Sequence, residues 1–235
     1  MIDLVTLCVK SFERPECLSR LLESITEYYP DLPVLVADDS ETHPDVPLPA
    51  RLLRLPYDTG LSEGRNILLQ HVETPYFVLL DDDFIFCEQT RLELLLPLVA
   101  SGAVDILGGD IISNGKSMRY HGWLWIHGTT LYHKHRKVNG SPVLCDLIMN
   151  FFLANTDTVR NVGWDPEQKM FEHQDFFLRC KDAGLRVGFY PGCGIIHDPI
   201  RPPEYASIRY PKARECHKRF MKKRSLTQIV GSVTH

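Results

Sequence analysis

Residues 76–86 read YFVLLDDDFIF, an apolar run that ends in three adjacent carboxylates, Asp81, Asp82 and Asp83. The run predicts a buried strand, and the carboxylates follow at its end. Adjacent like charges repel one another, so a fold holds them together most readily where a cation is bound. Hard divalent cations prefer oxygen ligands. The stretch therefore predicts a divalent metal at the carboxyl end of a sheet strand; a solvated acidic turn or a helix start is the alternative.

Apolar strands and helices alternate on the amino-terminal side of this stretch. Strands are expected at 2–9, 33–37, 51–55 and 76–80, with a helix over 16–29 and a loop that turns into a helix over 60–71. This alternation predicts a parallel sheet covered by helices on both faces. Ligands of such sheets bind beyond the carboxyl ends of the strands. Because Asp38 and Asp39 end the second strand, two acid clusters are expected on one edge.

The carboxyl-terminal half has a different character. Residues 104–133 are rich in β-forming residues, glycine and aromatics, which favours a more antiparallel region. The next expected elements are a strand at 149–154, a helix over 172–183 and short strands at 186–190 and 194–197. Residues 209–224 hold eight Lys or Arg and one Glu. This composition is typical of a solvated helix, or of a basic segment near an anionic ligand or membrane surface.

Length and composition bound the protein class. The chain has 235 residues, 44% hydrophobic and 24% charged, which suffices for one domain with a full core. A net charge of −4 gives no indication of nucleic-acid binding. No apolar run approaches the roughly 20 residues of a membrane span, and no signal peptide is visible. The seven cysteines are expected to be buried thiols in a reducing compartment. We expect a cytoplasmic protein, with or without membrane association, or a Golgi-lumen catalytic domain if the chain is a fragment.

Short motifs follow one another along the chain in a specific order. They are KSFER at 10–14, ADDS at 37–40, GLSEGRN at 60–66, LLDDD at 79–83, VGWD at 162–165, EHQDFFLR at 172–179 and IH at 196–197. This order resembles the inverting, family-2-like glycosyltransferases with the GT-A fold. It looks most similar to the β-1,4-N-acetylgalactosaminyltransferase family. The closer match rests on ADDS, GRN, DDDF, Asp146 with NFFLA at 150–154, HQDFFL at 173–178 and RYP at 209–211.

The resemblance implies a fold and a reaction. The fold would be α/β of the Rossmann-like GT-A type, with a mixed, mostly parallel central sheet and helices on both faces. One domain would span 1–235, with a nucleotide-binding half at 1–103, an acceptor and catalytic half at 104–208 and a basic segment at 209–235. The reaction would be metal-dependent, inverting transfer of GalNAc or a related hexose or HexNAc from a UDP-sugar. The implied acceptor is a glycan or glycolipid, with peripheral membrane contact through the basic segment.

The resemblance also implies roles for the residues around the sugar nucleotide. Asp39, with Asp38 beside it, would accept a hydrogen bond from the uracil, although an Asx turn is the alternative for both. The other expected nucleotide contacts are Lys10, Arg14, Arg65, Asn66 and Asp81. Asp83 would ligate Mn²⁺ or Mg²⁺, His197 would complete the metal shell, and Asp81 would face the ribose or a metal-bound water. Imidazole suits Mn²⁺ better than Mg²⁺.

Inversion needs a base that removes the proton of the acceptor hydroxyl. The broad family shows Glu-Asp where this chain has Glu172-His173, with the aspartate as base. The His-x-acid-Phe-Phe pattern points instead to Asp175. We rank Asp175 first, Glu172 second and His173 third. Capping and dipole matching at a helix start are the alternative for all three.

Four further residues are candidates for sugar contact. Asp146 and Asn150 are polar residues in an apolar stretch, and buried polar groups need partners. Trp123 lies in a glycine-flanked stretch, and Trp164 lies between Gly163 and Asp165. Aromatic faces pack well on the apolar side of a sugar, and core packing is the alternative.

Two other functions remain open from the residues. A sugar nucleotidyltransferase also uses a parallel sheet and Mg²⁺, but it needs a glycine-rich loop after the first strand, and residues 10–15 hold no glycine. A GT-A-like domain without turnover that binds a glycan or nucleotide is the other alternative, because His173 replaces the usual aspartate.

Overall fold

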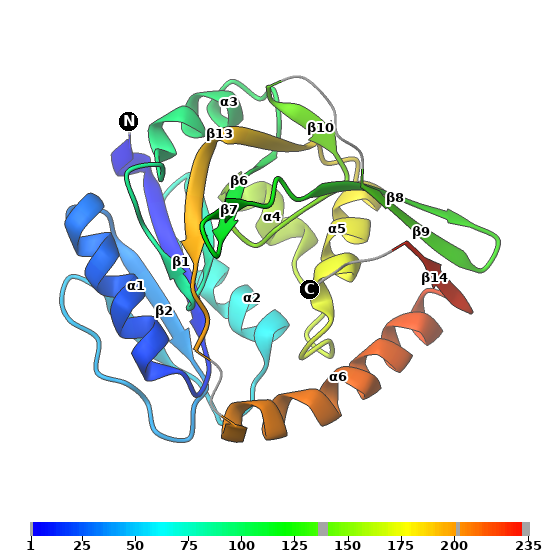
Figure 1. The fold of residues 1–235 in the computed structure, drawn as a ribbon, viewed down its shortest axis with the longest axis horizontal. Helices are drawn as coiled ribbons and strands as arrows, with labels where there is room; N and C mark the ends of the chain where they lie inside the picture. The colour runs from blue at the N-terminus through cyan, green and yellow to red at the C-terminus, as the bar shows by residue number, and fades with distance from the viewer. Residues whose placement is uncertain (1, 136–140, 201–202, 232–235) are drawn as a thin grey trace.

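The computed structural model describes residues 2–135, 141–200 and 203–231, which fold around one large sheet (Figure 1). This 10-stranded sheet has the order β10-β13-β6-β12-β4-β1-β2-β3, and β5 and β7 pair with β13 and β6. Its strands are β1 Val5–Ser11, β2 Val34–Asp38, β3 Arg51–Arg54, β4 Tyr76–Asp81, β5 Phe84–Ile85, β6 Ile106–Ser113, β7 Lys116–Ser117, β10 Val143–Cys145, β12 Phe152–Asn155 and β13 Val187–His197. The helices are α1 Pro15–Tyr28, α2 Leu61–His71, α3 Leu96–Ala100, α4 Thr156–Val162, α5 Glu172–Asp182 and α6 Pro203–Lys223, with 3-10 turns at Ile2–Leu4 and Leu92–Leu94.

The amino-terminal half of the sheet is parallel, as expected. Strand β1 pairs in parallel with β2 and β4, and β2 pairs in parallel with β3. The first strand begins at Val5 rather than at residue 2, because Ile2–Leu4 form a 3-10 turn. The register sets Ser11 opposite Asp38 and Lys10 opposite Asp81. The ends of β1, β2 and β4 therefore meet at one edge of the sheet.

The other half of the sheet is mixed. Strand β12 runs antiparallel to both β4 and β6, whereas β13 runs parallel to β6. The two short strands expected at 186–190 and 194–197 are one strand, β13, whose register shifts between Phe189 and Gly194. The sequence between these residues, Tyr190-Pro191-Gly192-Cys193, carries the proline and glycine that suggested an interruption.

Helices cover both faces of the sheet and bury a hydrophobic core against each. Alternation along β1 divides its side chains, because Leu7 and Val9 face one core and Cys8 faces the other. The first core contains the apolar face of α1, which begins at Pro15 in the first helical turn. The opposite core contains side chains of α2, α4 and α5.

A second, 4-stranded sheet has the order β11-β8-β9-β14, formed by β8 His121–His127, β9 Thr130–His135, β11 Leu147–Ile148 and β14 Gln228–Val230. Its β8–β9 hairpin confirms the expected antiparallel region. Helix α6 runs along one side of the molecule and leads to β14 of the second sheet (Figure 1), and it begins at Pro203 rather than at residue 209. Tyr205, Cys216 and Phe220 are buried along it, so this basic helix is packed rather than solvated all round. The side chains of Arg209 and Tyr210, and residues 232–235, lie outside the described part.

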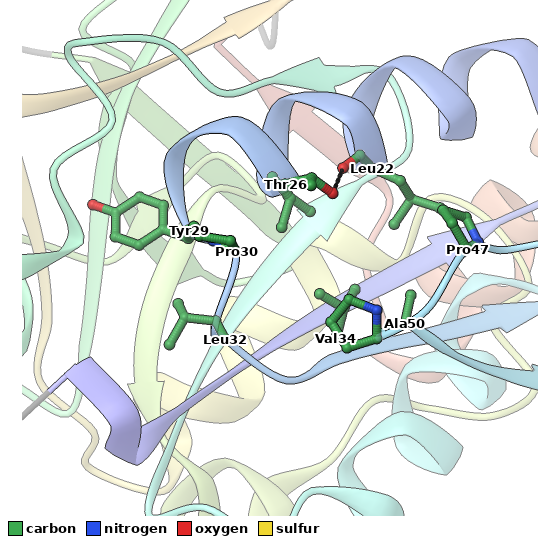
Figure 2. A pocket seen from close by; sticks show the side chains of 10 residues that line it. Leu22, Thr26, Tyr29, Pro30, Leu32, Val34, Pro47 and Ala50 are labelled. Atoms are coloured by element: carbon green, nitrogen blue, oxygen red, sulfur yellow. Dashed lines mark hydrogen bonds between the residues drawn. The ribbon is translucent and has the colours of Figure 1, made fainter.

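One pocket lies far from the acid clusters. Figure 2 shows it between α1 and the start of β2, lined mainly by apolar side chains such as Leu22, Leu32 and Ala50. Its threonine, Thr26, bonds the backbone carbonyl of Leu22 at 2.9 Å. The pocket is at the amino ends of β2 and β3, so it offers no chemistry to the opposite edge. None of the helices in the described ranges is both long and apolar enough to cross a bilayer.

Candidate active site

The carboxyl edge of the sheet joins an ammonium group to the acid that ends β2. The ammonium of Lys10 forms a buried ion pair with Asp39 Oδ1, and the backbone N–H of Gly60 donates to Asp39 Oδ2 at 2.7 Å. Burial lowers the pKa of Lys10. Gly64 on α2 leaves room for this side chain, because a Cβ at that position would collide with Lys10. The glycine of the GRN motif thus permits the Lys10–Asp39 pair.

The carboxylate of Asp38 closes a turn. Its Oδ1 accepts from the backbone N–H of Ser40 at 3.2 Å, and its Oδ2 accepts from the Ser40 hydroxyl at 2.9 Å. His43 Nδ1 lies 2.8 Å from the same carboxylate. These contacts are the Asx turn that was the alternative to base recognition.

An open pocket lies beside Asp39. It is lined from five parts of the chain by Lys10, Phe12, Asp39, Asp58, Gly60, Leu61, Lys169, Met170, Ile208 and Lys212. Asp58 forms ion pairs with Lys169 at 3.0 Å and with Lys212 at 2.9 Å, which ties α6 to the pocket rim. The ring of Phe12 lies 5.8 Å from that of Tyr57 and 6.5 Å from that of Tyr205. The pocket therefore combines an acid, ammonium groups and aromatic rings.

The acids after β4 are held by Arg14. Its guanidinium donates to Asp82 Oδ1 and, at 2.6 Å, to Asp83 Oδ2, and it lies 4.8 Å above the ring of Tyr205. Burial raises the pKa of Asp82 to about 6. Burial would also raise the pKa of Asp83, but the contacts with His197 and Arg14 outweigh it and hold that pKa well below its ordinary value. Arg14, expected at the nucleotide, is thus the internal partner of these acids.

Asp83 and His197 face one another across two paired strands. Strand β5 pairs with the end of β13, which sets His197 opposite Phe84. His197 Nε2 lies 3.6 Å from Asp83 Oδ2. An oxygen and an imidazole nitrogen form a donor set that suits Mn²⁺. Within the described residues no cluster of three or more His, Cys, Asp or Glu side chains completes a metal site, so the pair fits a cation whose other ligands come from a diphosphate or water.

Asp81 is held by two side chains instead. Arg65 Nη2 donates to Asp81 Oδ1 at 2.9 Å, and Asn150 Nδ2 donates to Asp81 Oδ2 at 3.0 Å. Each of these partners is bonded in turn to the first turn of α5. Arg65 Nη1 donates to Glu172 Oε1 at 2.5 Å, and Asn150 Oδ1 lies 3.0 Å from His173 Nδ1. Asp81, expected at the metal, thus belongs to a connected group of five side chains. Its other members are Arg65, Asn150, Glu172 and His173.

The guanidinium of Arg65 is buried and lies 5.8 Å from the centre of the Trp164 ring. Burial would lower the pKa of Arg65, but the charges of Glu172 and Asp81 outweigh it and raise that pKa. Burial would raise the pKa of Glu172, but the charge of Arg65 outweighs it and lowers that pKa. Arg65 therefore acts as an internal counter-ion for two acids.

Asp175 faces away from this connected group. Its Oδ1 lies 3.2 Å from Nε of Arg224, whose Nη1 lies 2.6 Å from Asp182. Only 2% of Asp175 is exposed. The ranking of Asp175 as first candidate for the base does not agree with this geometry, which connects Glu172 and His173 to Asp81. About one helical turn separates Glu172 from Asp175, which pairs with Arg224, the residue that follows α6.

Three other expected contacts have structural partners. The side chain of Asn66 bonds the backbone N–H and C=O of Trp164 at 2.8 and 2.9 Å. The Trp164 ring is buried and stacks on Phe176 at 4.1 Å. Asp146 accepts from the N–H of Leu124 at 2.8 Å and pairs with Lys181 at 2.7 Å. These placements favour packing and turn roles over contact with a ligand.

Trp123 belongs to the second sheet. It lies on β8, partly buried against the core, and its ring meets that of His121 edge-on at 5.6 Å. These contacts do not connect Trp123 to the acids at the sheet edge. Trp123 therefore stays a prediction for sugar contact. Asn150 is the member of that group which reaches Asp81.

The match to a family model decides the classification, since the model of glycosyl transferase family 2 matches residues 6–179. The chain belongs to glycosyl transferase family 2. It is 34% identical over 237 residues to β-1,4 N-acetylgalactosaminyltransferase 2 of Mus musculus, covering 97% of this chain and 45% of that protein. It is 36% identical over 231 residues to β-1,4 N-acetylgalactosaminyltransferase 1 of Homo sapiens, covering 88% and 43%. This family 2 chain thus spans less than half the length of the curated relatives it matches.

Solved structures show that this family 2 chain has the GT-A fold. S. aureus TarS 1-349 in complex with UDP-GlcNAc matches with a TM-score of 0.67 at 15% identity, over 95% of this chain and 66% of that one. GalNAc-T7 with UDP, GalNAc and Mn²⁺ matches with a TM-score of 0.62 at 14% identity, over 82% and 43%. The expected fold class and family are therefore confirmed.

The motifs did not indicate how α6 contributes to the site. Tyr205, Ile208 and Lys212 come from this helix and lie against Arg14 or line the pocket beside Asp39. Tyr205 and Ile208 lie outside every quoted motif, and only long-range contacts bring them to the sheet edge. Phe12 had a signal, because it lies inside the KSFER motif at the end of the first strand.

Proposed function

We propose that the chain transfers a sugar from a UDP-sugar to a hydroxyl group of a glycan, with inversion at the anomeric carbon. The observation that carries this proposal is the pairing of Asp83 with His197 at 3.6 Å, on the same sheet edge as the pocket beside Asp39. The names of the curated relatives support GalNAc, or a related N-acetylhexosamine or hexose, as the sugar. The division into halves at residue 103 remains part of this proposal.

The nucleotide binds in the pocket beside Asp39. The Asp39 carboxylate already accepts from Lys10 and Gly60, and its remaining lone pairs can accept the uracil N3–H. Phe12 offers a ring face to the base, and Lys169 and Lys212 stand on the rim. The mixture of aromatic, acidic and ammonium groups suits a nucleoside diphosphate.

Asp83 and His197 hold the divalent cation. When bound there, Mn²⁺ or Mg²⁺ neutralises the negative charge that grows on the UDP leaving group. In the structure Arg14 donates to Asp83 Oδ2, which is the oxygen nearest to His197. The positive charge of Arg14 would therefore repel a cation at this oxygen.

The base for inversion comes from the first turn of α5. Asp81 connects through Arg65 to Glu172 and through Asn150 to His173. Direct displacement at the anomeric carbon requires the acceptor hydroxyl to lose its proton as its oxygen attacks. The first turn of α5 is therefore the side of the site that receives the acceptor.

The test is a thermal-shift screen of UDP and UDP-sugars with and without Mn²⁺, followed by assays of UDP release with a panel of glycoside acceptors. A bound donor raises the melting temperature by mass action. We expect a shift with UDP that requires Mn²⁺ and is absent in Asp83→Ala. A Mn²⁺-independent shift of equal size in Asp83→Ala would remove the metal role.

A GT-A domain that binds a sugar nucleotide without turnover is the second candidate. The observation in its favour is His173, which stands where the broad family has an aspartate. Such a domain shows the Mn²⁺-dependent shift with UDP but no UDP release with any acceptor. Membership of a glycosyltransferase family sets aside the nucleotidyltransferase alternative.

The acceptor is a glycan or a glycolipid. Arg214, Lys218 and Lys222 recur every four residues along α6 and are exposed, so they form a basic stripe on one side of the helix. Such a stripe favours an anionic membrane surface near the acceptor. Co-sedimentation with anionic vesicles, absent with neutral vesicles and lost when all three residues are changed to glutamate, is the expected result.

A further inference from the structure

The geometry points to Asn150 as a positioning residue that fixes the tautomer of His173, so that Nε2 of His173 takes the proton of the acceptor hydroxyl. This inference rests on the proposed function for its chemical step, but not for the tautomer itself. Asn150 lies between β11 and β12, and His173 lies in the first turn of α5. Both side chains are only half-buried.

The orientation of the Asn150 amide follows from its two neighbours. The Asp81 carboxylate is ion-paired with Arg65 and accepts hydrogen bonds. The amide nitrogen of Asn150 therefore faces Asp81, at 3.0 and 3.4 Å from its two oxygens. This leaves the amide oxygen toward His173 Nδ1, at 3.0 Å. The assignment thus depends on the hydrogen-bond network and not on the amide alone.

The amide oxygen in turn decides the proton on the imidazole. A carbonyl oxygen only accepts, so Nδ1 of His173 must donate to Asn150. In the neutral imidazole the other nitrogen, Nε2, then carries the lone pair. The hydrogen-bonded chain from Asp81 through Asn150 to His173 also stabilises the positive charge that the ring acquires when it takes a proton. The arrangement thus provides a base, His173, and a carboxylate, Asp81, which orients that base through the amide of Asn150.

The two carboxylates in the first turn of α5 are less suitable. Glu172 is buried and ion-paired with Arg65, and this pairing lowers its pKa and weakens it as a base. Asp175 is buried against Arg224. The Nε2 atom of His173 is itself shielded from bulk water. A water-poor site strengthens the electrostatic interactions within it.

The step balances as follows. The acceptor O–H bond breaks and its proton moves to Nε2 of His173, while the acceptor oxygen forms a bond to the anomeric carbon. The bond from that carbon to the β-phosphate oxygen breaks, and its electron pair leaves with UDP. The imidazolium then returns its proton to solvent.

The first experiment reads the tautomer directly and needs no substrate. In protein labelled with ¹⁵N-histidine, long-range proton–nitrogen correlation spectra distinguish Nδ1–H from Nε2–H, and His173→Asn identifies the signals of His173. We expect Nδ1–H in the wild type at a pH where the ring is neutral, and a mixture of tautomers in Asn150→Ala. Wild-type His173 with its proton on Nε2 would overturn the inference.

The second experiment measures turnover. His173→Asn keeps a nitrogen donor toward Asn150 but cannot take a proton, so kcat should fall about 10²- to 10⁴-fold. The Kd for UDP with Mn²⁺, measured by calorimetry, should stay within about twofold, since His173 is not expected at the nucleotide. Imidazole added to His173→Gly should restore part of the rate. The matched control is His127→Asn, an exposed histidine on β8.

The outcomes separate the two proposals. If the wild type binds UDP and releases it from UDP-GalNAc, but His173→Asn keeps its kcat, then the base assignment fails while the proposed function stands. If the wild type binds no UDP with Mn²⁺, the proposed function fails, and the tautomer spectra still decide the role of Asn150. His173→Gln serves as a second variant if His173→Asn does not fold.

Discussion

The guanidinium of Arg65 lies 2.5 Å from the carboxylate of Glu172, although 107 positions separate the two residues in the chain. Both side chains are buried, and the pair ties the start of α2 to the start of α5. Arg65 also pairs with Asp81 at 2.9 Å. The pair therefore holds the end of β4 in place from two helices.

Removal of the Arg65 side chain should destabilise the folded protein. Arg65→Met leaves Glu172 as a buried charge without its counter-ion, which is expected to lower the free energy of unfolding by about 3–5 kcal/mol. Urea denaturation measures this change. Arg65→Lys should lose less, although one ammonium group cannot span both acids. Arg51→Met, on the exposed surface of β3, is the control. A loss no larger than that of the control would show that the buried pair contributes nothing.

Asp175→Asn tests whether Asp175 has a structural or a catalytic role. The substitution weakens the contact with Arg224, so it should lower the melting temperature. We expect UDP release below that temperature to stay close to the wild-type rate, because the carboxylate faces α6. A melting temperature equal to that of the wild type together with abolished transfer would restore Asp175 as the base.

The metal pair can be tested from either side. Asp83→Ala and His197→Ala should each remove the dependence of UDP affinity on Mn²⁺, because each deletes one of two protein ligands. Isothermal calorimetry of UDP with increasing Mn²⁺ measures this dependence. Arg14→Met should have the opposite effect on Mn²⁺ affinity, since it removes the competing cation from Asp83. Unchanged affinity in all three variants would contradict a cation at this position.

The contact between Asp165 and Lys223 should make the anchoring of α6 sensitive to acid. Burial would raise the pKa of Asp165, but the hydrogen bond and charge of Lys223 outweigh it and lower that pKa. A lowered pKa means that the folded state holds fewer protons, so the contribution is complete above about pH 4 and is lost as the pH falls through the folded value. Near pH 7 the melting temperature of the wild type should therefore be higher than that of Asp165→Asn.

The same pair of proteins should converge in acid. Below the lowered pKa the Asp165 carboxylate is protonated in both states, so the two melting temperatures should approach each other as the pH falls. Asp157→Asn is the control, because Asp157 forms an exposed pair with Arg160 within one helix, worth little in water. A difference between wild type and Asp165→Asn that stays constant from pH 7 to pH 3 would contradict this account.

Much of the fold follows from local pattern. The apolar runs at β1, β2 and β4 predict parallel strands, and the acids that end β2 and β4 predict the edge at which they meet. The extent of α6 was not predictable in this way. Its proline at 211 lies inside the helix, and its amino-terminal turn is fixed by the burial of Tyr205 against Arg14. Long-range packing of this kind leaves no periodic signal.

The residue types of the site could be predicted from the sequence, but the direction in which each side chain points could be predicted less well. Asp39, Asp83 and His197 lie on the sheet edge in the expected order, because strand ends place them there. Asp175 and Asn66 were expected to face a ligand, yet they bond Arg224 and the Trp164 backbone. Helical spacing says which side chains share a face, but it does not say which neighbour covers each turn.

Strand β13 lies between β10 and β6 within the large sheet, and its last residue is His197. It follows the region that the family model matches, which ends at residue 179. A nascent chain leaving the ribosome therefore exposes the edge of β6 until this strand emerges, and domains are made from the amino-terminus onward. The imidazole of His197 and the α6 residues that line the pocket beside Asp39 are made after this strand pairing has been left open. A chain whose translation stops before β13 should thus be aggregation-prone and inactive, rather than an enzyme of reduced activity.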